Sequence, residues 1–378
     1  MNGKGSNYYI KTLATEIGNR VKLAARNRGK GWYTPFMAAA SRAIAERIPL
    51  VDFVVEVRDA RIPMSSECQL LSNDMPSSRR IIVMNKMDLA NRSQLKDWVK
   101  YFDQRNYISC VLNSHNKDSV KLFLNFLQAQ IRALKNIDHS SHTVTIMLVG
   151  TPNVGKSALA NSLHQIGRIS AAEKGKLKHA IVSPHPGETK DISSLKIGSH
   201  PNIYVLDTPS ILPPQIREAE VCTKLALTAG AIEDCLVGEK ELAQLFLAIL
   251  NLSDEYKKWT NLLLHEYDKS FANHKTECSS DRQLDTKEKK QYVTDHTQDF
   301  IVNDARRVLF EKISCFNGDK QNEVDLEKLI RLQFTALAEA FRLPPELGDD
   351  ADSKVAAKLL NLYRTGRLGH YTLDPLDM

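Results

Sequence analysis

The amino-acid sequence predicts an α/β fold followed by a smaller all-α domain, and three observations support this prediction. Short apolar runs that end in polar motifs recur over the first part of the chain, which is typical of buried parallel strands. A glycine-containing phosphate-loop pattern joins one of these runs to a helix. From residue 219 onward, apolar residues recur instead at helical spacing.

We therefore expect three regions along the 378 residues: a basic N-terminal arm over 1–30, the α/β domain over 31–218 and the helical domain over 219–378. A polar insert at about 266–297 interrupts the helical domain. No apolar run approaches the roughly 20 residues of a membrane span. The six cysteines are scattered without a C-x-x-C pair, so neither a zinc site nor a disulfide framework is indicated.

The positive charge of the chain is concentrated at its N-terminus. The net charge is +6, and the first 50 residues carry nine Lys and Arg against only Glu16 and Glu46. Apolar residues from Ile10 to Ala24 recur at helical spacing, which predicts a basic amphipathic helix. Three interpretations of this helix remain open: a targeting segment, an RNA-contacting arm, and a solvated helix that packs on the domain.

Two predicted strands deliver polar motifs. The first, 51–57, ends in Arg58-Asp59-Ala60-Arg61-Ile62-Pro63, which we interpret as a salt-bridged strand end. The second, 81–84, leads into Asn85-Lys86-Met87-Asp88, the N-K-x-D pattern of GTPases. An ionised Asp88 only accepts hydrogen bonds, so it suits the N1–H and N2–H₂ donors of guanine, a pair that adenine lacks. Asn85 can bridge the base and neighbouring loops, and the stem of Lys86 can lie on the ring.

The strand after this motif, 107–112, ends at Asn113-Ser114. A short loop at this point can offer backbone N–H groups to guanine O6, so both residues are predicted to bind the nucleotide. An ordinary turn is the alternative interpretation.

The phosphate loop is Gly150-Thr151-Pro152-Asn153-Val154-Gly155-Lys156-Ser157, which fits G-x-x-x-x-G-K-[ST]. Its glycines allow successive backbone N–H groups to wrap a phosphate. Lys156 places a positive charge on the β- and γ-phosphates, and the Ser157 hydroxyl completes a Mg²⁺ shell. The predicted phosphate-binding residues are Asn153, Val154, Gly155, Lys156, Ser157 and Ala158.

Two further residues are predicted to sense the γ-phosphate. Thr189 lies in a long basic stretch, 167–192, where a Thr can bind Mg²⁺ only while the γ-phosphate is present; an ordinary Pro-Gly turn is the alternative. Asp207 comes after a buried strand, 203–206, and is expected behind the water shell of Mg²⁺. Together with Lys156, these two residues form the predicted catalytic set.

The motif that begins at Asp207 departs from D-x-x-G, because Ser210 stands where glycine is usual. Its N–H can reach the γ-phosphate only if the backbone tolerates a side chain there. Ile211 stands where many GTPases carry the Gln that orients the attacking water, and an apolar side chain cannot do this. We therefore expect slow intrinsic hydrolysis.

The order of these motifs is reversed. In an ordinary small GTPase the phosphate loop comes first, whereas here 85–88 precedes 150–157, and 207–210 comes last. Circular permutation produces this order when closely spaced termini are joined and the chain is opened elsewhere. The segment after Asp207 then leads directly into the C-terminal region, so a nucleotide-dependent movement of 207–215 should pull on the helices of that region.

Taken together, D-A-R-I-P, N-K-M-D, G-T-P-N-V-G-K-S, P-G-x-T and D-T-P resemble the YlqF-type circularly permuted ribosome-assembly GTPases. The segments 31–33 and 37–42 are most similar to the plant mitochondrial DAR GTPase branch. The resemblance covers about 31–251 and returns at 354–374. It implies GTP hydrolysis coupled to assembly of the large ribosomal subunit, with contacts to rRNA and ribosomal proteins.

The resemblance also implies Mg²⁺ as cofactor, K⁺ bound with the help of Asn153, a mitochondrial matrix location and peripheral association with the inner mitochondrial membrane. The cytoplasm or another organelle is the alternative location. The sequence also contains a C-terminal cluster of aromatic and basic residues. These side chains could stack on RNA bases and pair with phosphates, or they could form a solvated helix end, and both interpretations explain the cluster equally well. Its members are Tyr363, Arg364, Arg367, His370 and Tyr371.

Two functions are consistent with these patterns. The first is a GTPase that converts GTP and water to GDP and phosphate as a switch on an assembling ribosome. The second is a nucleotide-gated scaffold that binds GTP with little hydrolysis. Ser210 and Ile211 support this second hypothesis, because both depart from the residues that usually assist hydrolysis. An ATPase is a third hypothesis, and it requires that Asp88 does not select the base.

Overall fold

The computed structural model describes most of the chain. The described residues are 6–27, 35–71, 76–135, 143–170, 191–199, 202–213, 216, 218–232, 238–260, 296–344 and 349–376. Thr189, most of the 167–192 stretch and residues 266–295 of the predicted polar insert lie outside them.

The chain divides into two compact units. The α/β unit contains Ala14–Gly238 and His370–Met378, and the helical unit contains Met1–Leu13 and Glu239–Gly369. The boundary that we predicted after residue 218 therefore lies inside the α/β unit. The last nine residues also belong to that unit, although the chain reaches them only after the helical unit.

One sheet forms the centre of the α/β unit. Within the described residues it has six strands in the order β3-β2-β1-β4-β6-β5. These are β1 (Phe53–Asp59), β2 (Arg80–Asn85), β3 (Ile108–Val111), β4 (Val144–Val149), β5 (Ser193–Ser199) and β6 (Asn202–Asp207). Neighbouring strands are parallel except for the antiparallel pair β5 and β6. The predicted α/β fold and its permuted motif order are confirmed.

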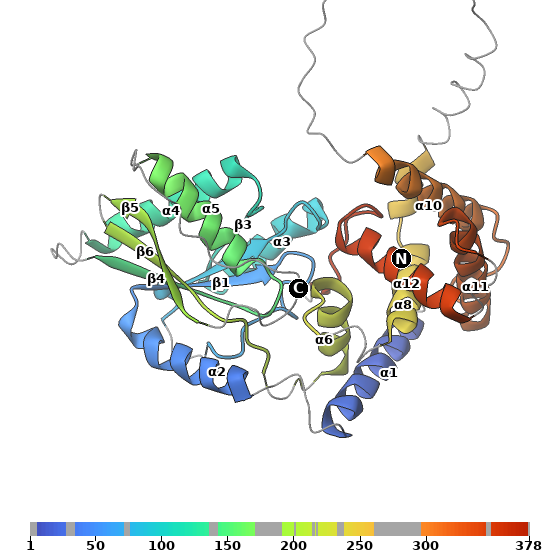
Figure 1. Ribbon diagram of the computed structural model, residues 1–378, viewed down its shortest axis with the longest axis horizontal. Coiled ribbons are helices and arrows are strands. Elements are labelled where there is room, and N and C mark those ends of the chain that lie inside the picture. The colour runs from blue at the N-terminus through green and yellow to red at the C-terminus, as the bar shows by residue number, and fades with distance from the viewer. Residues whose placement is uncertain are drawn as a thin grey trace, which may run out of the picture. The chain divides into compact units, whose positions relative to one another are not determined.

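Helices cover both faces of this sheet, because the strands are apolar on both sides. On one face, α4 (Lys117–Lys135) and α5 (Lys156–Ser170) pack on inward residues of β1, β2, β4, β5 and β6. On the other face, α2 (Pro35–Arg47) packs on β1 and β4, and α3 (Arg92–Asp103) packs on β2. Figure 1 shows α4 and α5 on the side of the sheet opposite to α2.

The α/β unit contains shorter elements as well. These are η1 (Ile48–Leu50), η2 (Ser77–Arg79), α6 (Ala219–Lys224) and η3, a π-helical turn (Leu225–Ala229). The helix α1 (Ser6–Asn27) packs against α6: Ile17 is fully buried, and a Cβ on Gly18 would lie 2.1 Å from the backbone oxygen of Ala219. Of the three interpretations of the N-terminal helix, packing on the domain is therefore observed.

The helical unit is built from α8 (Glu239–Leu252), η4 (Glu255–Trp259), α10 (His296–Ser314), α11 (Glu323–Ala340) and α12 (Asp349–Arg364). The ring of Phe246 on α8 lies 4.5 Å from that of Tyr363 on α12. The buried amides of Asn251 and Gln333 pair through two hydrogen bonds of 2.9 and 2.7 Å. Among the described helices, none combines the length and apolarity that a membrane crossing requires.

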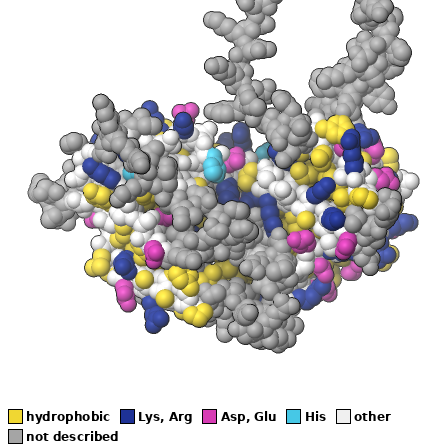
Figure 2. All heavy atoms as spheres, viewed as in Figure 1, with side chains coloured by type: hydrophobic (Ala, Val, Ile, Leu, Met, Phe, Trp, Pro, Cys, Tyr) yellow, Lys and Arg dark blue, Asp and Glu magenta, His cyan; other side chains and the backbone are white. Residues whose placement is uncertain are grey.

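The burial of one tyrosine in the tail of the α/β unit and of one in the helical unit changes one prediction. Tyr363 and Tyr371 are only 2% and 5% exposed, so neither ring is available to stack on RNA bases, and that interpretation is wrong for these two residues. On the face in Figure 2, the basic and acidic side chains of this unit are interspersed rather than gathered in one basic patch.

Candidate functional site

The predicted motifs meet at one edge of the sheet. The parallel strands β1, β2, β4 and β6 end at or next to Asp59, Asn85, Gly150 and Asp207. In the strand register, Asp59 lies beside Asn85, and Leu148 lies beside Asp207. Ligands of open α/β sheets bind at this carboxyl edge, where the loops and helix N-termini point toward them.

Asn85 joins the two motifs that are reversed along the chain. Its side-chain amide donates a 2.8 Å hydrogen bond to the backbone oxygen of Val154 in the phosphate loop. The same amide lies 2.4 Å from the position where a Cβ on Gly155 would be, so only glycine fits there without movement. The N-K-x-D corner and the phosphate loop therefore lie against each other at the same edge of the sheet.

The Asn113-Ser114 corner is part of the same assembly. The Ser114 N–H donates to the side-chain oxygen of Asn85 at 3.0 Å, and the His115 N–H donates to the side-chain oxygen of Asn113 at 2.8 Å. The Asn113 N–H donates to the hydroxyl of Ser119 at 3.1 Å. These backbone donors, predicted for guanine O6, are engaged within the protein here, so binding the base in that way requires the corner to rearrange.

Lys156 is the first residue of α5 and is folded back onto its own loop. Its ammonium donates 3.0 Å hydrogen bonds to the backbone oxygens of Gly150 and Thr151, and a 2.7 Å bond to the Ser210 hydroxyl. Burial lowers the pKa of Lys156 to about 8, although the charge of Asp207 opposes this. Phosphate oxygens would replace these neutral acceptors and favour the charged ammonium.

Asp207 fits a metal-bound water. Its side chain is fully buried, and neither carboxylate oxygen has a described hydrogen-bond partner of good geometry. Burial raises the pKa of Asp207, while the nearby Ser157 hydroxyl and Lys156 ammonium partly oppose the rise. A buried carboxylate beside a serine hydroxyl is the oxygen donor set that hydrated Mg²⁺ requires.

Lys86 is fixed by residues to which sequence analysis assigned no binding role. Its ammonium lies 3.1 Å from a carboxylate oxygen of Asp59, and its backbone has a φ of 62°, which is uncommon for a lysine. Arg61 pairs with the same carboxylate at 2.8 Å. Burial alone would raise the pKa of Asp59, but the charges of Arg61 and Lys86 hold it below its usual value.

We call residues 59–66 the DAR loop. Besides the Asp59 pairs, its Ala60 N–H donates to the backbone oxygen of Asn85 at 2.8 Å. The interpretation of 58–63 as a salt-bridged strand end is thus right about the pairing but misses its contacts with Asn85 and Lys86 of the N-K-x-D motif. The signal available was the sequence D-A-R directly after a buried strand. Asp88 itself is exposed at this edge.

The remaining predicted residues differ in their surroundings. The Asn153 amide donates to the backbone oxygen of Gly230 at 3.1 Å, and its φ is 60°. Val154 is buried under the sheet and Ala158 is half-buried in α5. Ile211 is 5% exposed and packs in the core beneath α2, so its side chain takes no part in the site.

Known proteins are similar to this chain in sequence. A family described as 50S ribosome-binding GTPase matches residues 145–294. Mitochondrial DAR GTPase 2 of Arabidopsis thaliana is 60% identical over 365 residues, which cover 96% of this chain and 95% of that protein. This chain belongs to the DAR GTPase family. The predicted resemblance to the plant mitochondrial branch of YlqF-type GTPases is confirmed.

Two further relatives share less sequence identity with this DAR GTPase. Short integuments 2, mitochondrial, of Arabidopsis thaliana is 41% identical over 93% of this chain and 90% of its own length. Mitochondrial ribosome-associated GTPase 1 of Xenopus tropicalis is 31% identical over 60% of this chain and 71% of its own length. As a member of this family, the protein is a mitochondrial GTPase that uses Mg²⁺ with its nucleotide.

Proposed function

We propose that this DAR GTPase is an assembly factor for the large subunit of the mitochondrial ribosome, with GTP bound at the carboxyl edge of the sheet. One observation carries the nucleotide site: the 2.8 Å hydrogen bond from Asn85 to Val154, which closes the guanine motif onto the phosphate loop. The ribosomal partner is inferred from the relatives, since the matching family is described as 50S ribosome-binding and one relative as mitochondrial ribosome-associated.

In this proposal each residue has a separate task. Asp88 accepts hydrogen bonds from guanine, and Lys86 lies on the ring. The amides of 153–158 and the Lys156 ammonium hold the phosphates. Ser157 would coordinate Mg²⁺ and Asp207 would orient its water shell, and the metal would supply positive charge for the β- and γ-phosphates. Thr189 completes the metal site only with GTP bound, and Asn113 and Ser114 reach the base after the corner rearranges.

Hydrolysis should be slow until the ribosome is bound. The buried Ile211 cannot orient the attacking water. In addition, the Lys156 ammonium donates a 2.7 Å hydrogen bond to the Ser210 hydroxyl, which holds it on the phosphate-loop side of the site. We propose that K⁺ held with the help of Asn153, together with a ribosomal component, stabilises the transition state of hydrolysis in place of the absent Gln side chain. We place the protein in the matrix, with peripheral contact to the inner mitochondrial membrane.

Single-turnover GTP hydrolysis tests this function. The rate is measured with and without mitochondrial large subunits, in K⁺ and in Na⁺. We expect stimulation by subunits and by K⁺, and co-sedimentation of the protein with the large subunit when a non-hydrolysable GTP analogue is present. Binding of the subunit without stimulation would favour the second function, a nucleotide-gated scaffold. The absence of both would contradict a ribosomal role.

A change at Ser210 tests whether this residue slows GTP hydrolysis, as the scaffold hypothesis requires. A Ser210→Gly variant restores the usual D-x-x-G motif and removes the hydroxyl that accepts from Lys156. If Ser210 limits turnover, the variant should hydrolyse GTP faster at unchanged GDP affinity. An equal rate in both proteins would show that the serine does not restrain hydrolysis.

A further inference from the structure

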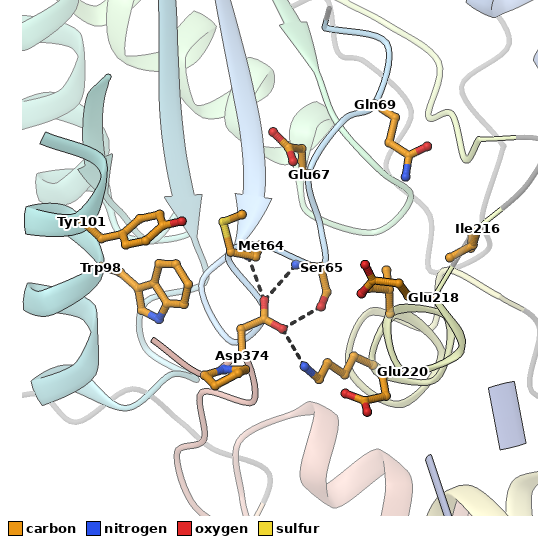
Figure 3. A pocket seen from close by; sticks show the side chains of 13 residues that line it. Met64, Ser65, Glu67, Gln69, Trp98, Tyr101, Ile216, Glu218, Glu220 and Asp374 are labelled. Carbon is orange, nitrogen blue, oxygen red and sulfur yellow. Dashed lines mark hydrogen bonds and ion pairs between the residues drawn. The ribbon is translucent and has the colours of Figure 1, made fainter. Parts of the chain in front are cut away.

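The C-terminal tail, residues 370–376, belongs to the α/β unit and is held there by hydrogen bonds and an ion pair. Figure 3 shows the carboxylate of Asp374 pointing at the DAR loop on one side and at α6 on the other. It accepts 2.8 Å hydrogen bonds from the N–H groups of Met64 and Ser65, and a 2.6 Å bond from the Ser65 hydroxyl. Lys224 pairs with it at 3.1 Å.

Asp374 is therefore a buried carboxylate whose oxygens both accept hydrogen bonds. The residue is 6% exposed, so these four donors replace the water that it loses. A buried carboxylate without such donors would be costly, and donors left without the carboxylate would be costly too. The tail and the DAR loop consequently stabilise each other.

The tail is connected to the guanine motif through this loop. The Leu373 N–H donates to the backbone oxygen of Arg61 at 2.8 Å. Arg61 pairs with Asp59, which pairs with Lys86 at 3.1 Å. On the other side of the motif, the Asn91 N–H, three residues after Asp88, donates to the Thr372 hydroxyl at 3.3 Å. The tail therefore contacts the segment just after Asp88 directly and is linked to Lys86 through Arg61 and Asp59.

The tail also contacts the segment that comes after the γ-phosphate motif. Lys224 lies on α6, and Arg61 donates a second 3.0 Å hydrogen bond to the backbone oxygen of Thr228 in η3. In sequence, α6 and η3 are the next described helical elements after Asp207 and Ile211. The pocket beside Asp374, about 440 Å³ in volume, is lined by the DAR loop, α3, α6 and the tail together.

We propose that the C-terminal tail is part of the nucleotide switch and that Asp374 is a positioning residue, which holds the DAR loop where it fixes Lys86 for guanine. This inference rests on the proposed guanine site. Because coupling is reciprocal, nucleotide binding must strengthen docking of the tail as much as docking strengthens binding. The tail continues directly from Gly369 of the helical unit, so the chain carries the change in docking to that unit.

The test compares Asp374→Asn with the wild-type full-length protein. We expect GDP affinity to fall about 5-fold to 30-fold, which is typical of coupling between two sites. The affinity for inorganic pyrophosphate, which reports on the phosphate loop and not on the guanine motif, should stay unchanged, because the described contacts of the tail do not include the phosphate loop. The matched control is Asp352→Asn, which removes an exposed 2.6 Å ion pair with Lys240 in the helical unit and should leave both affinities unchanged.

Three outcomes overturn the coupling. GDP affinity equal to wild type shows that the tail does not act on the guanine site, and an equal loss for GDP and pyrophosphate shows a general structural defect. If Asp374→Asn fails to fold, hydrogen exchange of the wild-type protein decides: GDP should slow the Met64, Ser65 and Leu373 amides, and unchanged rates refute the proposal. Failure of the wild-type protein to bind GDP would instead refute the proposed function.

Discussion

The phosphate loop and the DAR loop end neighbouring strands at the same edge of one sheet, but they are held in different ways. Lys156 bonds to Gly150 and Thr151, only six and five residues away along the chain. The DAR loop is held by Thr228, 167 residues from Arg61, and by Asp374, 309 residues from Ser65. The phosphate loop thus combines these local bonds with contacts to Asn85 and Ser210, whereas the DAR loop is held mainly by segments that are distant in the sequence.

This difference predicts different responses to mutation. A change in the phosphate loop should alter ligand binding and leave folding stability nearly intact. A change around the DAR loop should alter both, because its partners join distant parts of the α/β unit. The guanine motif lies between the two loops, since Asn85 bonds to one and Lys86 to the other.

The largest effect is expected at the guanine motif. Asp88→Asn should reduce the preference for GDP over ADP by about 1,000-fold, or about 4 kcal/mol, because the amide faces guanine donors with a donor of its own. Competition binding with the two nucleotides measures it. An unchanged preference would support an ATPase and contradict the assignment of Asp88.

The next largest effect is expected on folding stability when an ion pair of the DAR loop is removed. Arg61→Met should lower the free energy of unfolding by about 3 kcal/mol, because Asp59 remains buried with only Lys86 as its charge partner. Denaturant unfolding measures it. The double variant Asp59→Asn/Arg61→Met removes both charges and should recover part of the loss. If the single variant is as stable as wild type, the DAR loop does not depend on this pair.

The matching change in the phosphate loop should separate binding from stability. Lys156→Met should weaken GDP binding about 100-fold through loss of the charged contact to phosphate. Its unfolding free energy should change less than that of Arg61→Met, because the hydrogen bonds of the Lys156 ammonium go to neutral acceptors rather than to a paired carboxylate. Calorimetric binding and denaturant unfolding on the same sample test both parts. A large loss of stability would show that the fold depends on the phosphate loop as strongly as on the DAR loop, and it would contradict the comparison.

The smallest effect is a pH dependence of nucleotide binding. The pKa of Lys156 is about 8 in the free protein, and phosphate oxygens should raise it in the complex. Between the two pKa values binding takes up a proton, so GDP affinity should fall as pH rises above 8, by at most about tenfold per pH unit. Titrations from pH 7 to 9 measure this slope. The Lys156→Met variant should lack it, and an equal slope in both proteins would assign the titration to another group.

Several features of this GTPase could be predicted from the sequence alone. Residues 150–157 and 85–88 are short patterns in which each side chain has a fixed chemical task, so they indicate a site without the fold. Apolar runs before each motif predicted the parallel strands, and the reversed order of the motifs predicted the permutation. The apolar Ile211 predicted that no side chain at that position can orient water, and its burial agrees with this.

Only the tertiary structure decided which residues support these motifs. Asp374 is one acidic residue near a chain end, and nothing in its neighbours indicates that it bonds to Ser65. Likewise, Tyr363 and Tyr371 had the composition of an RNA-contacting cluster but are buried. The physical reason is range: a phosphate loop depends on backbone geometry within a few residues, whereas burial and long-range ion pairs depend on which distant segments the folded chain brings together.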